Sequence, residues 1–128
     1  MIFFFDRSVG RIIPQTLVQL NPPVQIEYYD AHFLMDEPDD EWLPIVGSDG
    51  WFVIGQDSHY HLRPNELAAL KLYNVGCFYL GDAEQTRWET IRIFMRAFDK
   101  IVKAAEQTPL PFVFRVDSRG RLTEIYLT

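Results

Sequence analysis

The sequence predicts an α/β fold in three layers, in which helices cover both faces of a mainly parallel sheet and an antiparallel hairpin ends the chain. Short apolar runs typical of buried strands alternate with segments of helical periodicity, an order typical of parallel sheets. The final segment, "PFVFRVDSRGRLTEIYL", instead indicates two strands joined by a tight turn. With 128 residues, 48% of them apolar, the chain can bury the core of a single domain over residues 1–128.

The expected elements alternate along the chain until this hairpin. Four strands are expected, each a short apolar or alternating run: 2–5, 24–30, 51–55 and 77–80. Four helices are expected between and after them: 11–20, 39–47, 64–74 and 82–107. Pro64 and Glu66 are start signals for the third helix, and Gly47 is expected to end the second.

The helix at 82–107 is amphipathic. Its apolar face is expected to hold five large side chains: Trp88, Ile91, Met95, Phe98 and Val102. All three tryptophans, Trp42, Trp51 and Trp88, stand in apolar patterns, so we expect them in the core rather than in base-stacking positions. Cys77, in the apolar run "VGCFYL", is also expected to be buried.

The same helix carries a basic stripe. Four residues fall on it at i, i+4, i+8 and i+11: Arg92, Arg96, Lys100 and Lys103. An RNA strand could lie along this stripe. We favour a solvated face supported by Asp99–Lys103 and Glu89–Arg92 pairs, because charged stripes on helices usually face solvent.

Composition excludes several classes of protein. A net charge of −6 argues against tight non-specific binding of nucleic acid, but not against an enzyme that gathers carboxylates around metal ions. The single cysteine excludes a disulfide framework and a thiolate zinc cluster. No apolar run is long enough to span a membrane and the first residues do not form a signal peptide, so we expect a cytoplasmic protein without a membrane partner.

Three carboxylates are expected to meet at one edge of the sheet. Asp6 follows the first strand, Asp57 follows the third, and Asp39 begins the helix that leads into the third. Ligands of open α/β sheets bind outside the carboxyl ends of the strands. Clustered carboxylates are costly unless cations neutralise them, and Mg²⁺ and Mn²⁺ prefer oxygen ligands. The alternative for each residue is a helix cap or turn former.

A zinc site is not favoured. His59 and His61 lie two residues apart and would share one side of an extended segment. Together with His32 they have no recognised zinc spacing, so polar loop residues are the interpretation that we favour.

Three stretches, "FFFDRSVGR", "HFLMDEPDDEWLPIVGSDGWFVIGQD" and "RPNELAAL", resemble the PIN-like domain family of VapC45-type toxins, which is related to the Mut7-C and DUF5615 PIN-like groups. The resemblance runs from about residue 2 to residue 116 and lies in the order of the motifs. It implies an α/β/α nuclease that uses clustered acidic residues to bind Mg²⁺ or Mn²⁺ and cleave RNA. Many such domains are toxins of bacterial toxin–antitoxin pairs.

The resemblance also implies roles for individual residues. Asp6, Asp39 and Asp57 would be the acidic metal ligands, with Asp40 and Glu41 as rivals of Asp39 because one helical position decides which side chain faces the crevice.

Three further residues flank these positions. Glu66 is either a fourth catalytic carboxylate or a helix-capping residue, and Arg7 and Arg63 would contact the scissile phosphate of the substrate.

The function expected from the resemblance is a metal-dependent endoribonuclease, as a toxin of a type II pair. Its partners would be RNA, an antitoxin protein and a second copy of the chain in a homodimer. The sequence departs from the family at Gly55, where Thr or Ser is usual, and at Ser58, where a basic residue is common. An inactive PIN-like interaction module is therefore the alternative. A small-molecule-binding α/β domain is less favoured, because the chain has no Gly-rich phosphate loop.

Overall fold

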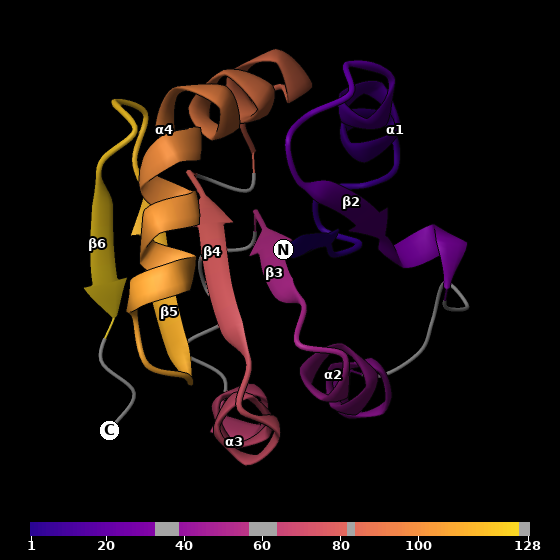
Figure 1. Ribbon diagram of the computed structural model, residues 1–128, viewed down its shortest axis with the longest axis vertical. Coiled ribbons are helices and arrows are strands. Elements are labelled where there is room, and N and C mark those ends of the chain that lie inside the picture. Colours follow the sequence, from indigo (N-terminus) through magenta and orange to yellow (C-terminus); the bar gives the residue numbers. More distant parts are fainter. Residues whose placement is uncertain (33–38, 57–63, 82–83, 126–128) are drawn as a thin grey trace.

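The computed structural model describes residues 1–32, 39–56, 64–81 and 84–125 (Figure 1). Its strands are β1 (Ile2–Phe5), β2 (Gln25–Tyr28), β3 (Phe52–Gly55), β4 (Gly76–Leu80), β5 (Phe112–Val116) and β6 (Leu122–Ile125). Its α-helices are α1 (Ile12–Gln19), α2 (Asp39–Ser48), α3 (Pro64–Tyr73) and α4 (Arg87–Gln107), and a short 3-10 helix η1 (Tyr29–Ala31) follows β2. The predicted α/β fold is confirmed.

All six strands form one sheet in the order β2-β1-β3-β4-β5-β6, in which only the β5–β6 pair is antiparallel. The chain runs from β1 outward to β2 and then crosses to β3 on the other side of β1. The strand order therefore reverses between β1 and β3. In open α/β sheets a crevice forms at such a reversal, at the edge where the parallel strands end, here called the carboxyl edge.

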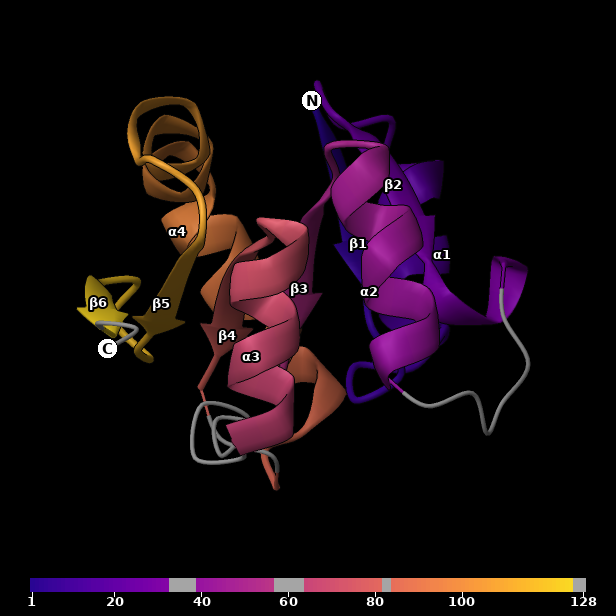
Figure 2. The same cartoon turned by 90° about the horizontal axis from the view of Figure 1, so that it is seen from below.

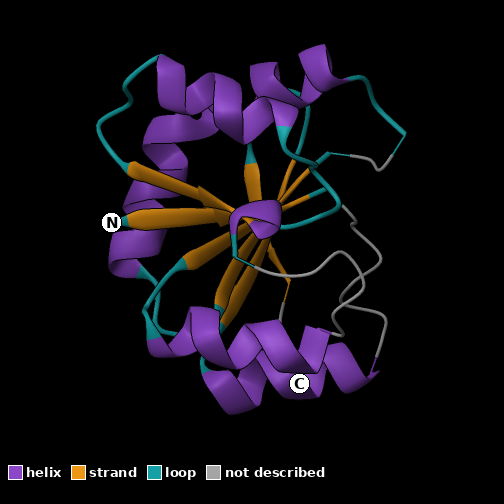
Figure 3. Ribbon diagram, turned by 90° about the vertical axis from the view of Figure 1, so that its right-hand side faces the viewer, coloured by secondary structure: helices purple, strands orange, loops and turns teal. Residues whose placement is uncertain are grey.

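The helices lie in two layers, one on each face of the sheet. Figure 3 shows the fan of strands between these layers, and Figure 2 shows α2 and α3 side by side over one face. The helices α1 and α4 cover the other face, where Ile13 and Leu17 of α1 share a core cluster with Ile93 and Phe94 of α4. Because each parallel strand connects to the next through a helix, α2 and α3 both begin at the carboxyl edge.

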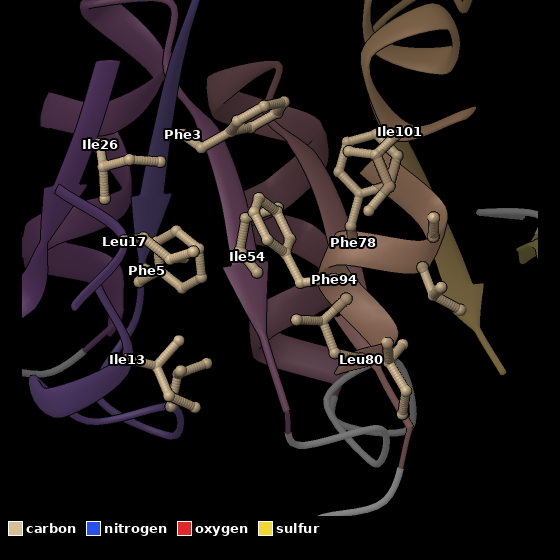
Figure 4. Packing of buried hydrophobic residues seen from close by; sticks show 14 of the residues in the cluster. Phe3, Phe5, Ile13, Leu17, Ile26, Ile54, Phe78, Leu80, Phe94 and Ile101 are labelled. Carbon is tan, nitrogen blue, oxygen red and sulfur yellow. The ribbon is translucent and has the colours of Figure 1, made fainter. Parts of the chain in front are cut away.

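The first strand is buried on both faces. Phe3 and Phe5 point into the cluster between the sheet and α1/α4, where Phe5 contacts Phe94 with ring centroids 5.4 Å apart (Figure 4). Phe4 points to the opposite face and stacks on Trp51 at 5.8 Å. A strand covered on both sides needs apolar residues at every position, which is why the sequence shows a continuous run rather than an alternation.

The helix α4 begins later than expected and buries a different face. Its N-cap is Thr86, whose side chain accepts a hydrogen bond from the Glu89 N–H. The expected apolar face is wrong for two residues, because Trp88 and Met95 are 70% and 57% exposed. The buried residues are instead Thr90, Ile93, Phe94, Ala97, Ile101 and Ala105. The stripe with the bulkiest side chains therefore does not define the buried face of α4.

Other local expectations had mixed outcomes. Cys77 is buried as expected, and Trp51 is partly buried against the cluster between the sheet and α2/α3. Gly47 does not end α2, which continues to Ser48. A side chain at Gly47 would collide with the Tyr73 carbonyl oxygen at the end of α3, so this glycine allows the two helices to pack. The side chain of Trp42 lies outside the described residues.

In the described ranges, no helix combines the length and the apolar character needed to cross a membrane.

Candidate metal and nucleic-acid site at the carboxyl edge

Asp6 lies at the point where the strand order reverses. Its backbone N–H donates to the Ile54 carbonyl at 3.0 Å, which extends the β1–β3 pairing one residue past the end of β1. The Asp6 carbonyl accepts from the Val9 N–H at 3.2 Å, and this bond closes the turn that follows. The residue is 5% exposed. The sheet itself therefore holds a buried carboxylate between β1 and β3.

Ser8 orients the Asp6 carboxylate. The Ser8 backbone N–H donates to Asp6 Oδ1 at 2.9 Å, and the Ser8 hydroxyl donates to the same oxygen. The Ser8 Oγ in turn accepts from the Gln56 backbone N–H at 2.9 Å. One hydroxyl thus connects the carboxylate that follows β1 to the first residue after β3.

Gly55 packs directly against the other carboxylate oxygen. A Cβ at this position would stand 2.9 Å from Asp6 Oδ2 and 2.9 Å from Cε1 of Tyr79, closer than real Cβ contacts allow. Tyr79 is itself buried, so it has no room to withdraw. The Thr or Ser side chain that the resemblance leads us to expect at residue 55 therefore does not fit there. The hydroxyl beside the carboxylate comes from Ser8 instead.

The negative charge of Asp6 affects the pKa of a buried thiol in the neighbouring core. Burial raises the pKa of the Cys77 thiol, and the negative charge of Asp6 raises it further. Cys77 and Tyr79 lie on the face of β4 that α2 and α3 cover. The Asp6 side chain therefore stands on the same face as the helices that carry Asp39 and Glu66.

The structure locates the other expected carboxylates only in part. Asp39 is the first residue of α2 and Glu66 stands in the first turn of α3, so both lie where their helices begin at the carboxyl edge, but their side chains lie outside the described residues. Asp57 and Arg63 lie outside them altogether. Among the side chains that are described, no three acidic, His or Cys residues form a metal-binding group. The expected ligand set stays a prediction.

Arg7 and His32 have identifiable contacts. The Arg7 guanidinium carbon lies 5.8 Å from the ring centroid of the buried Tyr29, a cation–π contact with the segment after β2. His32 Nε2 lies 2.7 Å from Glu27 Oε2, as in a local ion pair. This contact with a carboxylate is consistent with the interpretation of His32 as a polar loop residue. His59 and His61 lie outside the described ranges.

A polar network that no sequence pattern predicts continues from this site to α4. Gln56 Nε2 donates to the Gln85 carbonyl at 3.5 Å. Gln85 Nε2 donates to the Leu80 carbonyl at 2.6 Å and to the Thr90 hydroxyl oxygen at 2.9 Å. The role of Ser8 could have been predicted from the sequence, since Asp-x-Ser after a strand is typical of a turn with side-chain hydrogen bonds. No sequence pattern indicates the contact between the two glutamines, because it depends on the tertiary fold.

Comparison with known proteins supports the resemblance of the motifs. A family model described as a PIN like domain matches residues 1–82, which include β1 to β4 and exclude α4, β5 and β6. No curated protein and no solved structure gives a significant match to the chain.

Proposed function

The chain belongs to the PIN-like domain family, and from this premise we propose that it is a metal-dependent endoribonuclease. Membership indicates a nuclease-type function and nucleic acid as a ligand, and domains of this family generally use divalent metals. The observation that carries the proposal is the buried Asp6 carboxylate at the reversal of strand order, held by two hydrogen bonds from Ser8. The VapC45-type subgroup and its role as a toxin stay predictions.

A divalent metal site is part of this proposal. Asp6, Asp39 and Asp57 would hold one or two Mg²⁺ or Mn²⁺ ions, with Glu66 as a fourth carboxylate. The donor chemistry fits, because these cations prefer carboxylate oxygens. When bound, such an ion activates water and stabilises the leaving oxygen of a phosphodiester.

Other residues of the chain would orient the Asp6 carboxylate and bind the phosphate of the substrate. Ser8 fixes the direction of the Asp6 carboxylate through Oδ1. Arg7, which is exposed beside Asp6, would contact the phosphate on the outer side of the site together with Arg63. Gly55 supports the inner side, where its lack of a side chain lets Asp6 Oδ2 approach β3.

A calorimetric titration with Mn²⁺ tests the proposal. We expect Asp6→Asn to weaken Mn²⁺ binding by more than about 10-fold and to abolish RNA cleavage. Asp49→Asn is the matched control, because Asp49 is exposed just after α2, which ends away from the carboxyl edge. Equal Mn²⁺ affinity in wild type and Asp6→Asn would show that the site is wrong.

A second candidate function is an inactive interaction module. The observation that favours it is an apolar groove of about 270 Å³ between α1 and α4. Its lining is Leu17, Leu20, Pro22, Pro23, Phe94, Met95 and Phe98. Exposed apolar surface of this kind is typical of interaction sites, and an antitoxin protein or a second copy of the chain are the partners that we propose. Metal-dependent RNA cleavage that is lost in Asp57→Ala would contradict this candidate.

A further inference from the structure

Charge is divided unevenly along this acidic chain. Residues 1–86 hold four Lys and Arg against thirteen Asp and Glu, a net charge of −9. Residues 87–128 hold eight Lys and Arg against five Asp and Glu, a net charge of +3, and the two parts give the −6 of the whole chain. The positive part contains α4, β5 and β6, the elements outside the family match. A surface for an anionic partner is therefore expected there.

One ridge of α4 carries most of this charge together with an aromatic side chain. Five residues follow each other on the ridge at spacings of four or three: Trp88, Arg92, Arg96, Lys100 and Lys103. All four cations are exposed, and Trp88 is 70% exposed. The tryptophan that was expected in the core thus stands in solvent one turn before Arg92.

The β5–β6 turn adds cations beside the middle of this ridge. Arg96 Nη1 donates to the Ser118 carbonyl at 3.2 Å, so the Arg96 side chain lies against the turn. Asp117 holds the turn in shape by accepting from the Arg119 N–H at 2.9 Å and from the Arg121 N–H at 3.0 Å. Both arginines are exposed. Figure 1 shows the turn beside α4.

The solvated-face interpretation loses part of its support. The expected Glu89–Arg92 pair is present, with 3.4 Å between Arg92 Nη1 and Glu89 Oε1, but among the described residues the expected Asp99–Lys103 pair does not form. Within the described part of the chain, the side chains of Lys100, Lys103 and Arg119 have no acidic partner. These cations are therefore available for phosphate groups.

We propose that the α4 ridge and the β5–β6 turn bind single-stranded nucleic acid, with a base stacked on Trp88 and the phosphates held by the cations. An exposed aromatic platform beside a basic track is what single strands require, because stacking is possible only for unpaired bases. The inference deepens the proposed function, on which the choice of RNA rests.

The ridge begins at the edge of the sheet that contains Asp6, although α4 and the Asp6 side chain lie on opposite faces of the sheet. The helix α4 begins at the carboxyl edge, two residues after Gln85, whose backbone carbonyl accepts a hydrogen bond from the Gln56 side chain. The β5–β6 turn lies at the same edge, since the Gly81 N–H after β4 donates to the Val116 carbonyl at the end of β5, 2.9 Å away. A strand bound along the ridge would therefore reach the edge that contains Asp6.

Fluorescence anisotropy with a labelled oligonucleotide of roughly 12 nucleotides tests the inference. The full chain is used in EDTA, so that binding is measured without cleavage, and the arms are single-stranded RNA, single-stranded DNA and an RNA duplex. We expect Trp88→Ala to weaken single-strand binding by about 5- to 150-fold. Leu72→Ala is the matched control, because Leu72 is an apolar residue of α3, 73% exposed, in the opposite layer.

The cations are tested by the salt dependence of the same binding. We expect Lys100→Gln and Lys103→Gln each to lower the slope of log affinity against log salt by about 0.7. Lys71→Gln on α3 makes the same change of charge in the opposite layer and is expected to leave the slope unchanged. All these side chains are exposed, so the variants keep the fold.

The possible outcomes are distinct. Binding of single-stranded RNA, with or without DNA, that depends on Trp88 and the two lysines supports the inference. Equal affinity for the duplex, or unchanged binding in Trp88→Ala, would overturn it. The proposed function is tested separately. If the chain binds single-stranded RNA as expected but does not cleave RNA with Mn²⁺, only the proposed nuclease activity is contradicted. If the chain cleaves RNA but Trp88→Ala binds RNA as well as wild type, only the proposed binding surface is contradicted.

Discussion

The Asp6 carboxylate packs closely against Gly55, since Asp6 Oδ2 lies 2.9 Å from the position that a Cβ on Gly55 would take. The two residues belong to neighbouring strand ends, and the Asp6 N–H bond to Ile54 sets their register. The glycine at residue 55 thus leaves room for the Asp6 carboxylate. The consequence is a site that tolerates no side chain at residue 55.

Gly55→Ala is expected to lower the free energy of unfolding by about 1–3 kcal/mol, because the new methyl group would meet both Asp6 and the buried ring of Tyr79. Urea denaturation measures this loss. Gly50→Ala is the comparison, because a Cβ there meets nothing within 4 Å and adds only the strain of a φ of +71°. A smaller loss for Gly55→Ala than for Gly50→Ala would contradict the close packing.

Ser8→Ala is expected to cost about 1–2 kcal/mol of stability, since it removes the hydroxyl that donates to Asp6 and accepts from the Gln56 N–H. It should also weaken Mn²⁺ binding in calorimetry, whereas Ser8→Thr, which keeps a hydroxyl, should restore both properties. Ser118→Ala serves as control, because Ser118 uses only its backbone carbonyl in the bond to Arg96. Unchanged Mn²⁺ affinity in Ser8→Ala would leave Ser8 with a purely structural role.

The Glu27–His32 contact predicts a pH-dependent stability at the end of β2. Burial alone would raise the pKa of Glu27, but hydrogen bonds with His32 and Gln25, together with the charge of His32, outweigh it and lower the pKa below its ordinary value of 4.5. A carboxyl group whose pKa is lower in the folded chain stabilises the fold at pH values above its pKa in the unfolded chain. This contribution disappears as the pH falls through the pKa of the folded chain. Melting curves between about pH 8 and about pH 3 should therefore show Glu27→Gln below wild type at neutral pH and converging with it in acid. A constant difference across the range would contradict the linkage.

Thr86→Ala is expected to destabilise the chain by about 0.5–2 kcal/mol, because Thr86 caps α4 through the Glu89 N–H. Thermal unfolding monitored by circular dichroism measures the loss. Thr108→Ala at the other end of α4 is the control, since Thr108 contributes its backbone N–H, not its side chain, to the cap. Equal melting temperatures for Thr86→Ala and wild type would show that other contacts determine where α4 begins.

Much of the fold could be predicted because strand and helix signals are local. The run Ile2–Phe5 indicates a strand buried on both faces, and the structure has β1 with those bounds. Asp6 could likewise be placed at the carboxyl edge, since its position follows from the end of this strand and the parallel order. The roles of Asp39, Asp57, Glu66 and Arg63 stay predictions, because their side chains lie outside the described residues.

The α4 helix shows where local patterns are insufficient. Helical periodicity correctly indicates a helix there, but it ranks faces by bulk and favours Trp88 and Met95. The sheet instead accepts a face that includes Thr90 and Ala97, which are fully buried. The fit of the helix to the strands beneath it decides which residues are buried. These strands lie outside the short stretch of sequence from which periodicity is read.

The α/β order, the parallel sheet and the placement of Asp6 at a strand end can be predicted from local patterns, because periodicity and strand length are properties of short segments. The atoms that meet around Asp6 depend on the tertiary fold. The Ser8 hydroxyl connects Asp6 to Gln56, which follows Ser8 by 48 residues, and Arg96 reaches the turn at Ser118. These contacts join residues far apart in sequence, so they depend on the register of the strands and on how α4 docks, which are set by the packing of the whole chain.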